Sequence, residues 1–264
     1  MRDPYLQAMG IEQWVRRESH PHPVNVAEDR PVTEQHSVAN VEEVVRAPEP
    51  VAEVVTATPE IELTPTQSRE SHNVDALGWT ELENCVAECT VCDLHATRTN
   101  TVFGSGDRNA DWMIIGEAPG ADEDKQGEPF VGQAGQLLTA MLQAMGLKRE
   151  QVYIANTLKC HPPENREPLP DEILCCQPYL RRQIELVQPK LILAVGHFAA
   201  KNLLERDETI KAMRGQYFEY ADTGIPVVVT YHPAYLLRKP SEKRKSWQDL
   251  QFAMHLFEQQ GRES

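Results

Sequence analysis

The sequence predicts an α/β protein of three layers, in which helices cover both faces of a central, mainly parallel four-stranded sheet. Short apolar runs alternate with longer segments whose apolar residues recur every three to four positions, a pattern typical of strand–helix–strand units. Each apolar run also ends at a turn or polar residue, at the edge where open α/β sheets place their ligands. The four expected strands are residues 113–115, 152–155, 191–195 and 226–230.

The expected helices lie around these strands. The segment 134–145 carries leucines and methionines on one face, and Gly146 ends it. Asp171 lies in the acidic first turn of a longer helix, where a negative charge suits the helix dipole. The expected helices are residues 79–92, 134–145, 171–187, 197–204 and 247–257.

Composition limits the possible functions. The chain has 264 residues and a formal net charge of −14, so a general nucleic-acid coat is excluded and any DNA contact must come from a local basic patch. No apolar run approaches the roughly 20 residues of a membrane span, and no signal peptide is visible. Six cysteines without a secretory signal indicate intracellular thiols. We therefore expect a cytoplasmic, monomeric protein without membrane contact.

The N-terminal third differs in character from the rest. Residues 1–19 combine Trp14 with several aliphatic side chains in a polar frame, which indicates a short docking peptide. Residues 20–74 are rich in Pro, Glu and Val, and the stretch from His20 to His72 contains no glycine. Such a segment buries too little apolar surface to offset chain entropy, so we expect an acidic, disordered linker. Residues 75–264 are then one folded domain.

The loop after the first strand has the composition of an active site. It turns through glycine and proline at 116–120 and brings Glu117, Glu123, Asp124 and Phe130 into one segment. No Gly-Lys-Ser/Thr follows, so this is not a nucleotide-triphosphate loop. The loops after the first, second and fourth strands are expected to meet at one edge of the sheet.

Four cysteines form a candidate metal site. Cys89 and Cys92 supply one Cys-x-x-Cys half, and Cys160 with Cys176 supplies a second. Zinc and a cubane iron–sulfur cluster both accept four thiolates, so the spacing leaves the two open. Cys85 and Cys175 are the expected bystanders.

From about residue 75 onward the chain resembles the family 4 uracil-DNA glycosylases, the iron–sulfur type. The motifs that carry the resemblance span nearly the whole domain. They are Cys89-Thr-Val-Cys92-Asp-Leu, the Gly104 turn, GEAPGADEDKQGEPFVGQAGQLL, Asn156-Thr-Leu-Lys-Cys160-His-Pro-Pro, Cys176-Gln-Pro-Tyr-Leu and His232-Pro-Ala-Tyr-Leu-Leu-Arg238.

The resemblance implies a uracil-DNA glycosylase-like fold and an enzyme that flips uracil out of DNA and hydrolyses its N-glycosidic bond, which leaves an abasic site. It also implies that Cys89, Cys92, Cys160 and Cys176 hold a structural four-iron, four-sulfur cluster, with zinc as the alternative.

The same resemblance assigns the catalytic residues. Asn156 presents its amide to uracil, and His232 donates a hydrogen bond to the oxyanion that develops on the base. Glu117 stabilises the cationic sugar or orients the attacking water.

Further contacts to the base are expected from the same loop. Phe130 stacks on the flipped ring. Glu123 lies beside the C5 edge, where it excludes the methyl group of thymine, and the main chain of Ala118 contacts the base.

The segment after His232 is the expected DNA grip. Leu236 and Leu237 are candidate wedges that fill the space left by the flipped base. Arg238, Lys239 and the basic residues at 243–245 supply the phosphate contacts that an acidic chain otherwise lacks.

Two further interpretations concern partners. The alternative function is a replisome adaptor whose glycosylase-like domain binds DNA without catalysis; intact Glu117, Asn156 and His232 favour the enzyme. Residues 1–19 weakly resemble the N-terminal segment of the clamp-loader psi subunit, which docks on the chi subunit. That resemblance implies recruitment to replication forks on the nucleoid.

Overall fold

The structure, a computed structural model, describes residues 74–263. The docking peptide and the linker expected at residues 1–19 and 20–74 lie outside the described residues, apart from the last linker residue, Val74. Within residues 74–263 no helix combines the length and the apolar character that crossing a membrane requires.

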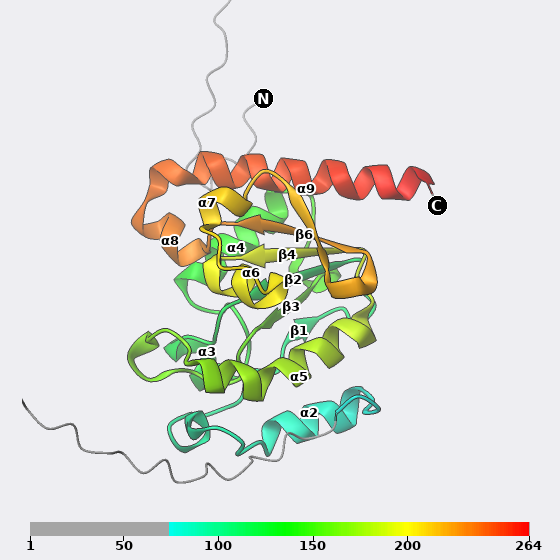
Figure 1. Ribbon diagram of the computed structural model, residues 1–264. Helices are drawn as coiled ribbons and strands as arrows, with labels where there is room; N and C mark the ends of the chain where they lie inside the picture. Colours follow the sequence, from blue (N-terminus) through cyan, green and yellow to red (C-terminus); the bar gives the residue numbers. More distant parts are fainter. Residues whose placement is uncertain (1–73, 264) are drawn as a thin grey trace, which may run out of the picture. The chain divides into compact units, whose positions relative to one another are not determined.

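A six-stranded sheet forms the centre of the fold, in the order β1-β3-β2-β4-β6-β5 (Figure 1). The four inner strands are parallel and match the four expected strands. Both faces of a parallel sheet are covered, so its strands are continuous apolar runs, as in β2 and β4, where every residue is buried. The strands are β1 (Ser105–Gly106), β2 (Trp112–Gly116), β3 (Tyr153–Asn156), β4 (Leu191–Val195), β5 (Tyr217–Tyr220) and β6 (Ile225–Thr230).

The expected count of four strands was too low because both edge strands are atypical. β1 has two residues and pairs antiparallel with β3. β5 pairs antiparallel with β6, and its residues alternate between exposed and half-buried positions. An edge strand with one solvated face has no continuous apolar run. The mainly parallel sheet and the three-layer α/β/α class are confirmed.

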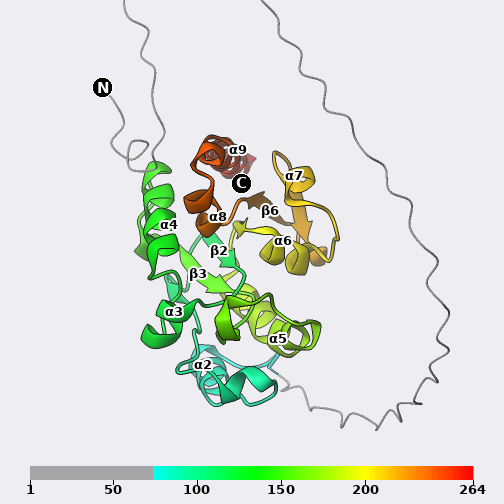
Figure 2. The ribbon, with the colours of Figure 1, turned by 90° about the vertical axis from the view of Figure 1, so that its left-hand side faces the viewer.

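Helices cover both faces of the sheet (Figure 2). Side chains of α4, α8 and α9 pack with Ile114, Leu193 and Val228 on one face. Side chains of α5, α6 and α7 pack with Ile115 and Ala194 on the other. The helices are α2 (Trp79–Ala87), α3 (Ala121–Gln126), α4 (Gln133–Ala144), α5 (Pro170–Val187), α6 (His197–Leu204), α7 (Ile210–Met213), α8 (Pro233–Arg238) and α9 (Lys243–Glu263), with 3₁₀ turns at Asp93–Ala96, Arg149–Gln151, Pro163–Asn165, Ala221–Thr223 and Pro240–Glu242.

Helices α2, α3 and α9 differ from expectation. α2 ends at Ala87, so Cys89 and Cys92 follow the helix instead of lying on it. The acidic loop contains α3, whose N3 residue Glu123 caps the backbone N–H of Gly120. α9 extends well beyond the expected 247–257 at both ends.

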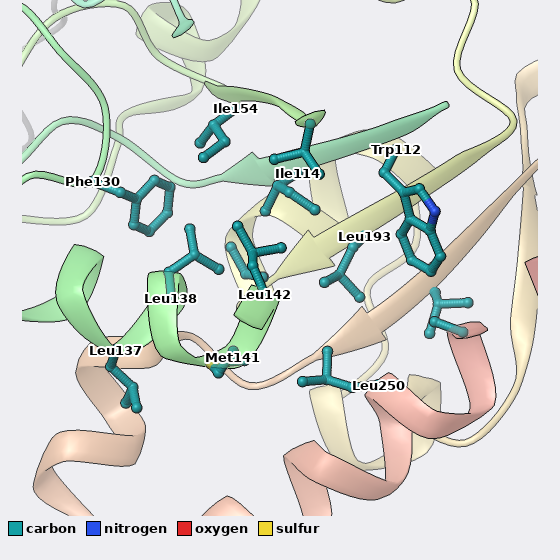
Figure 3. Close-up of a cluster of buried hydrophobic side chains, with 14 of the residues drawn as sticks. Trp112, Ile114, Phe130, Leu137, Leu138, Met141, Leu142, Ile154, Leu193 and Leu250 are labelled. Carbon is teal, nitrogen blue, oxygen red and sulfur yellow. The ribbon is translucent and has the colours of Figure 1, made fainter. Parts of the chain in front are cut away.

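The core on the α4 face reaches the carboxyl edge of the sheet. Figure 3 shows Phe130 at one end of this cluster, beside Leu138 and Ile154, with Trp112 at the other end. Phe130 is therefore held by core packing at the edge where β2, β3 and β6 end. In Figure 1 this edge lies on the left, next to α8.

Candidate active site

A cavity of about 600 Å³ opens at the carboxyl edge of the sheet. The loops after β2, β3 and β6 all contribute to it, so their expected convergence is confirmed. Seven of the sequence-predicted site residues line it together: Glu117, Ala118, Glu123, Phe130, Asn156, His232 and Arg238. A second cavity, about 840 Å³, lies among α5, α6 and β5 and contains none of these seven.

Asn156 ends β3 and is almost completely buried, at 1% exposure. Its Oδ1 atom has no hydrogen-bond partner among the described residues. A buried acceptor without a partner costs about 1–3 kcal/mol, which a ligand N–H donor would recover. Asn156 is thus prepared to bind a donor inside the cavity.

Gly116 makes room for this arrangement. A Cβ atom at Gly116 would lie 2.4 Å from Asn156 Oδ1 and 2.6 Å from Phe130 Cζ. Any larger residue at the end of β2 would displace one of the two groups. The loop motif therefore needs glycine here for space.

Phe130 has a backbone φ of 54°, a conformation that bulky residues rarely adopt. Gly135 allows the turn, since a Cβ at that position would lie 1.8 Å from the carbonyl oxygen of Phe130. The ring is 6% exposed and lines the cavity. Its position suits stacking against a flat ligand ring.

His232 precedes α8 as its N-cap. Its Nδ1 accepts the backbone N–H of Ala234 at 3.2 Å. Burial, together with the nearby charge of Arg238, lowers the pKa of His232 to about 4. The imidazole is therefore neutral near pH 7, and because Nδ1 accepts, the proton resides on Nε2, which is a hydrogen-bond donor.

The pKa of Glu117 is shifted upward, whereas that of His232 is shifted downward. Burial, together with the negative charge of Glu167, raises the pKa of the Glu117 carboxyl to about 7. A carboxyl group that titrates near neutrality inside a cavity is suited to general-base or electrostatic work.

Glu123 has a structural task that the sequence interpretation missed. Its Oε1 accepts the N–H groups of Val131 at 2.8 Å and Gly132 at 3.0 Å, and its Oε2 accepts that of Gly120 at 3.1 Å. The carboxylate thus ties both ends of the loop that carries Phe130. The spacing of glycine and glutamate, three residues apart before a helix, was the available signal. The assignment of Glu123 to the C5 edge of the base stays a prediction.

The two candidate wedge residues, both in α8, differ in burial. Leu236 is completely buried in the core cluster, so its assignment as an exposed wedge was wrong. Leu237 is 40% exposed. Adjacent helical residues point about 100° apart, so only one of them can face the core. Arg238 and Lys239 are exposed beside Leu237, as a phosphate contact requires.

Cys89, Cys92, Cys160 and Cys176 lie in one buried cluster, whereas Cys85 and Cys175 are only partly buried. Burial raises the pKa of Cys92 to about 11 and that of Cys176 to about 12, and neighbouring thiols add to both rises. Buried thiols that repel one another when ionised become ligands only when a metal compensates their charge. Donors are also in place, since Arg98 Nη1 lies 3.2 Å from Cys160 Sγ.

The arrangement of these thiols bears on the metal. A tetrahedral zinc site with Zn–S bonds of about 2.3 Å needs sulfur atoms about 3.8 Å apart. Within the described residues, no group of three or more His, Cys, Asp or Glu side chains could hold a single metal ion. The choice between zinc and a four-iron, four-sulfur cluster at the four buried thiols therefore stays a prediction.

Comparison with known proteins agrees with the fold and the cavity. Residues 103–251 match the family described as the uracil DNA glycosylase superfamily. This region contains all six strands of the sheet and every residue that lines the cavity. The chain therefore belongs to the uracil-DNA glycosylase superfamily.

Relatives define the branch. The chain is 48% identical over 161 residues to the type-4 uracil-DNA glycosylase of Archaeoglobus fulgidus, which covers 59% of this chain and 81% of the archaeal protein. It is 41% identical over 179 residues to that of Thermotoga maritima, covering 67% of this chain and 93% of the relative. A type-5 enzyme of Pyrobaculum aerophilum is 32% identical over 146 residues, 49% of this chain and 63% of the relative. The chain therefore belongs to the type-4 uracil-DNA glycosylase family.

Proposed function

We propose that this chain binds uracil flipped out of DNA in the cavity at the carboxyl edge of the sheet, and hydrolyses its N-glycosidic bond. The observation that carries the proposal is the buried Oδ1 of Asn156 without a partner. Uracil presents an N3–H donor between two carbonyl acceptors, so one carboxamide can accept from N3–H and donate to a carbonyl. Cytosine presents an acceptor at N3, which would face the acceptor Oδ1 of Asn156, so cytosine should bind poorly.

The ring of uracil stacks on Phe130, which contributes roughly 1–3 kcal/mol for a base–aromatic pair. The stacking is not specific to one base. Selectivity therefore comes from Asn156 and affinity from the ring.

Bond cleavage leaves negative charge on uracil and positive charge on the sugar. Neutral His232 donates its Nε2–H to the carbonyl oxygen that gains charge, an electrostatic contribution already oriented before the reaction. Ionised Glu117 stabilises the sugar cation or orients the water that attacks it. The low pKa of His232 and the raised pKa of Glu117 divide these tasks between the two groups.

DNA is gripped at α8. Leu237 enters the stack at the vacated position, and Arg238 and Lys239 contact phosphates. Local positive charge at this rim offsets the net charge of −14 of the whole chain.

The four cysteines hold a four-iron, four-sulfur cluster, which ties the segment after α2 to the β3 loop and to α5. The supporting observations are the buried thiol set and the guanidinium of Arg98 on Cys160. The cluster supplies structural cross-linking.

Residues 1–19 dock on the chi subunit of the clamp loader and hold the enzyme at replication forks on the cytoplasmic nucleoid. The support is the resemblance of this peptide to the psi subunit and its apolar anchor around Trp14. Residues 1–20 fused to an inert carrier should capture chi, and capture should fail when Trp14→Ala and Ile11→Ala are combined.

The activity itself is tested with a uracil-containing oligonucleotide. Free uracil and an abasic strand should both appear in amounts equal to the substrate consumed. Binding of the oligonucleotide without release of uracil would favour the alternative, a non-catalytic adaptor.

A further inference from the structure

Lys159 is a completely buried lysine between the cavity and the cysteines. Its Nζ donates to the backbone carbonyl of Asn156 at 2.9 Å and to Oε1 of Gln183 at 2.6 Å. Among the described residues no aspartate or glutamate forms an ion pair with it. A buried amino group is costly to leave without hydrogen-bond partners, so its contacts must be specific.

Gln183 is the second hydrogen-bond partner of the Lys159 amino group. Its Nε2 donates to the carbonyl of Phe103 at 2.8 Å and to the hydroxyl of Tyr153 at 3.2 Å. With both donors engaged, the amide has its oxygen toward Lys159. Gln183 is itself completely buried. The Nζ of Lys159 is therefore fixed by its bond to Gln183 and can hold the carbonyl of Asn156 in place through its second bond.

The backbone of Lys159 connects to the cysteine cluster. Lys159 directly precedes Cys160, one of the four cysteines of the buried cluster. The carbonyl of Lys159 accepts the N–H of Val102 at 2.8 Å. One residue is thus joined to a cysteine of the cluster through its main chain and to the carbonyl of Asn156 through its side chain.

We infer that Lys159 is a positioning residue that couples the cysteine cluster to Asn156, and so sets the geometry with which the enzyme recognises uracil. The inference rests on the proposed function. Lys159 does not contact the base; it fixes the main chain from which the Asn156 carboxamide extends. A misplacement of about 1 Å at such a group can lower a rate by about 100-fold.

The test uses full-length protein with Lys159→Met, which keeps the side-chain length and removes the donor. Single-turnover excision, normalised to cluster absorbance, should fall on the order of 10- to 100-fold. Affinity for DNA with a non-cleavable 2′-fluorinated deoxyuridine should fall as well, while affinity for DNA with an abasic analogue should not. Lys201→Met, which changes an exposed lysine paired with Asp207, is the matched control.

A double-mutant cycle separates positioning from general damage. If Lys159 acts through Asn156, Lys159→Met should cause no further loss in an Asn156→Ala background. A parental rate in Lys159→Met, or a full additional loss in that background, would overturn the inference. An inactive parental enzyme would instead refute the proposed function.

If Lys159→Met is purified without its cluster, Gln183→Leu takes its place. That variant keeps the Lys159 side chain and its hydrogen bond to Asn156 but removes the second partner of Nζ. A several-fold loss that disappears in the Asn156→Ala background supports the coupling, and a parental rate overturns it.

Discussion

The centroids of the Phe130 and His232 rings lie 5.7 Å apart, and the planes of the two rings are inclined by 32°. Phe130 comes from the loop after β2 and His232 from the start of α8, so two distant segments place a stacking surface beside a hydrogen-bond donor. A base stacked on Phe130 would have its carbonyl edge near His232. The packing of the two loops thus places the groups that we propose for stacking and hydrogen bonding side by side.

Gly116→Ala should abolish most activity without unfolding the protein. The new Cβ would lie within 3 Å of both Asn156 and Phe130, so the carboxamide and the ring must move apart. We expect single-turnover excision to fall by about 100-fold, as for other misplacements of about 1 Å. Gly261→Ala is the control, since nothing lies within 4 Å of a Cβ there. Equal rates for the two variants would contradict the packing argument.

The pH dependence of excision should report Glu117. The carboxylate is the active form and its pKa is raised to about 7, so the rate should rise through pH 7 and level off above about pH 8. His232, with a pKa near 4, stays neutral throughout and adds no second limb above pH 5. Stopped assays between pH 5.5 and 8.5 measure the profile.

Two variants check this assignment. Glu117→Gln should be slow and should lose the rise with pH. Glu167→Gln removes a charge that raises the pKa of Glu117, so the midpoint should move to lower pH. A midpoint unchanged in both variants would assign the profile to another group.

Leu236 and Leu237 form a matched pair. Leu236→Ala should destabilise the fold by about 2–5 kcal/mol, because a buried leucine leaves a cavity. Leu237→Ala should leave thermal unfolding unchanged and slow excision from duplex DNA more than from single strands, since only the duplex must be wedged open. Loss of stability in Leu237→Ala with normal duplex activity would refute the wedge.

If the four cysteines hold an iron–sulfur cluster, the purified protein should be coloured. Cys160→Ser should lose the broad visible absorbance of an iron–sulfur cluster and should lower the unfolding temperature, because three chain segments lose their cross-link. Cys85→Ser and Cys175→Ser should keep the colour. A colourless parental protein with one bound zinc ion would show that the cluster assignment is wrong.

The inner sheet was predictable because a parallel strand buried on both faces is a continuous apolar run, as at 191–195. The edge strands were not, because Tyr217–Tyr220 alternates between exposed and half-buried and gains its partner only through β6. That Asn156 and His232 lie at the same cavity was also predictable, because each lies at or just after the end of a parallel strand, and such strand ends meet at one edge of the sheet.

Side-chain direction was the part that the sequence could not supply. Leu236 and Leu237 are chemically identical neighbours, and only the docking of α8 decides which one is buried. Glu123 has the composition of a catalytic carboxylate, but its oxygens are engaged by main-chain N–H groups. Lys159 escaped notice because a lysine in a loop is usually exposed.

The most direct measurement is single-turnover release of uracil by Asn156→Ala and His232→Ala, each compared with the parental chain. If Asn156 recognises the base and His232 stabilises the developing oxyanion, each variant should be slower on the order of 100-fold or more, with unfolding temperature and affinity for abasic DNA unchanged. Release of uracil at the parental rate by both variants would show that this cavity is not the site of the reaction.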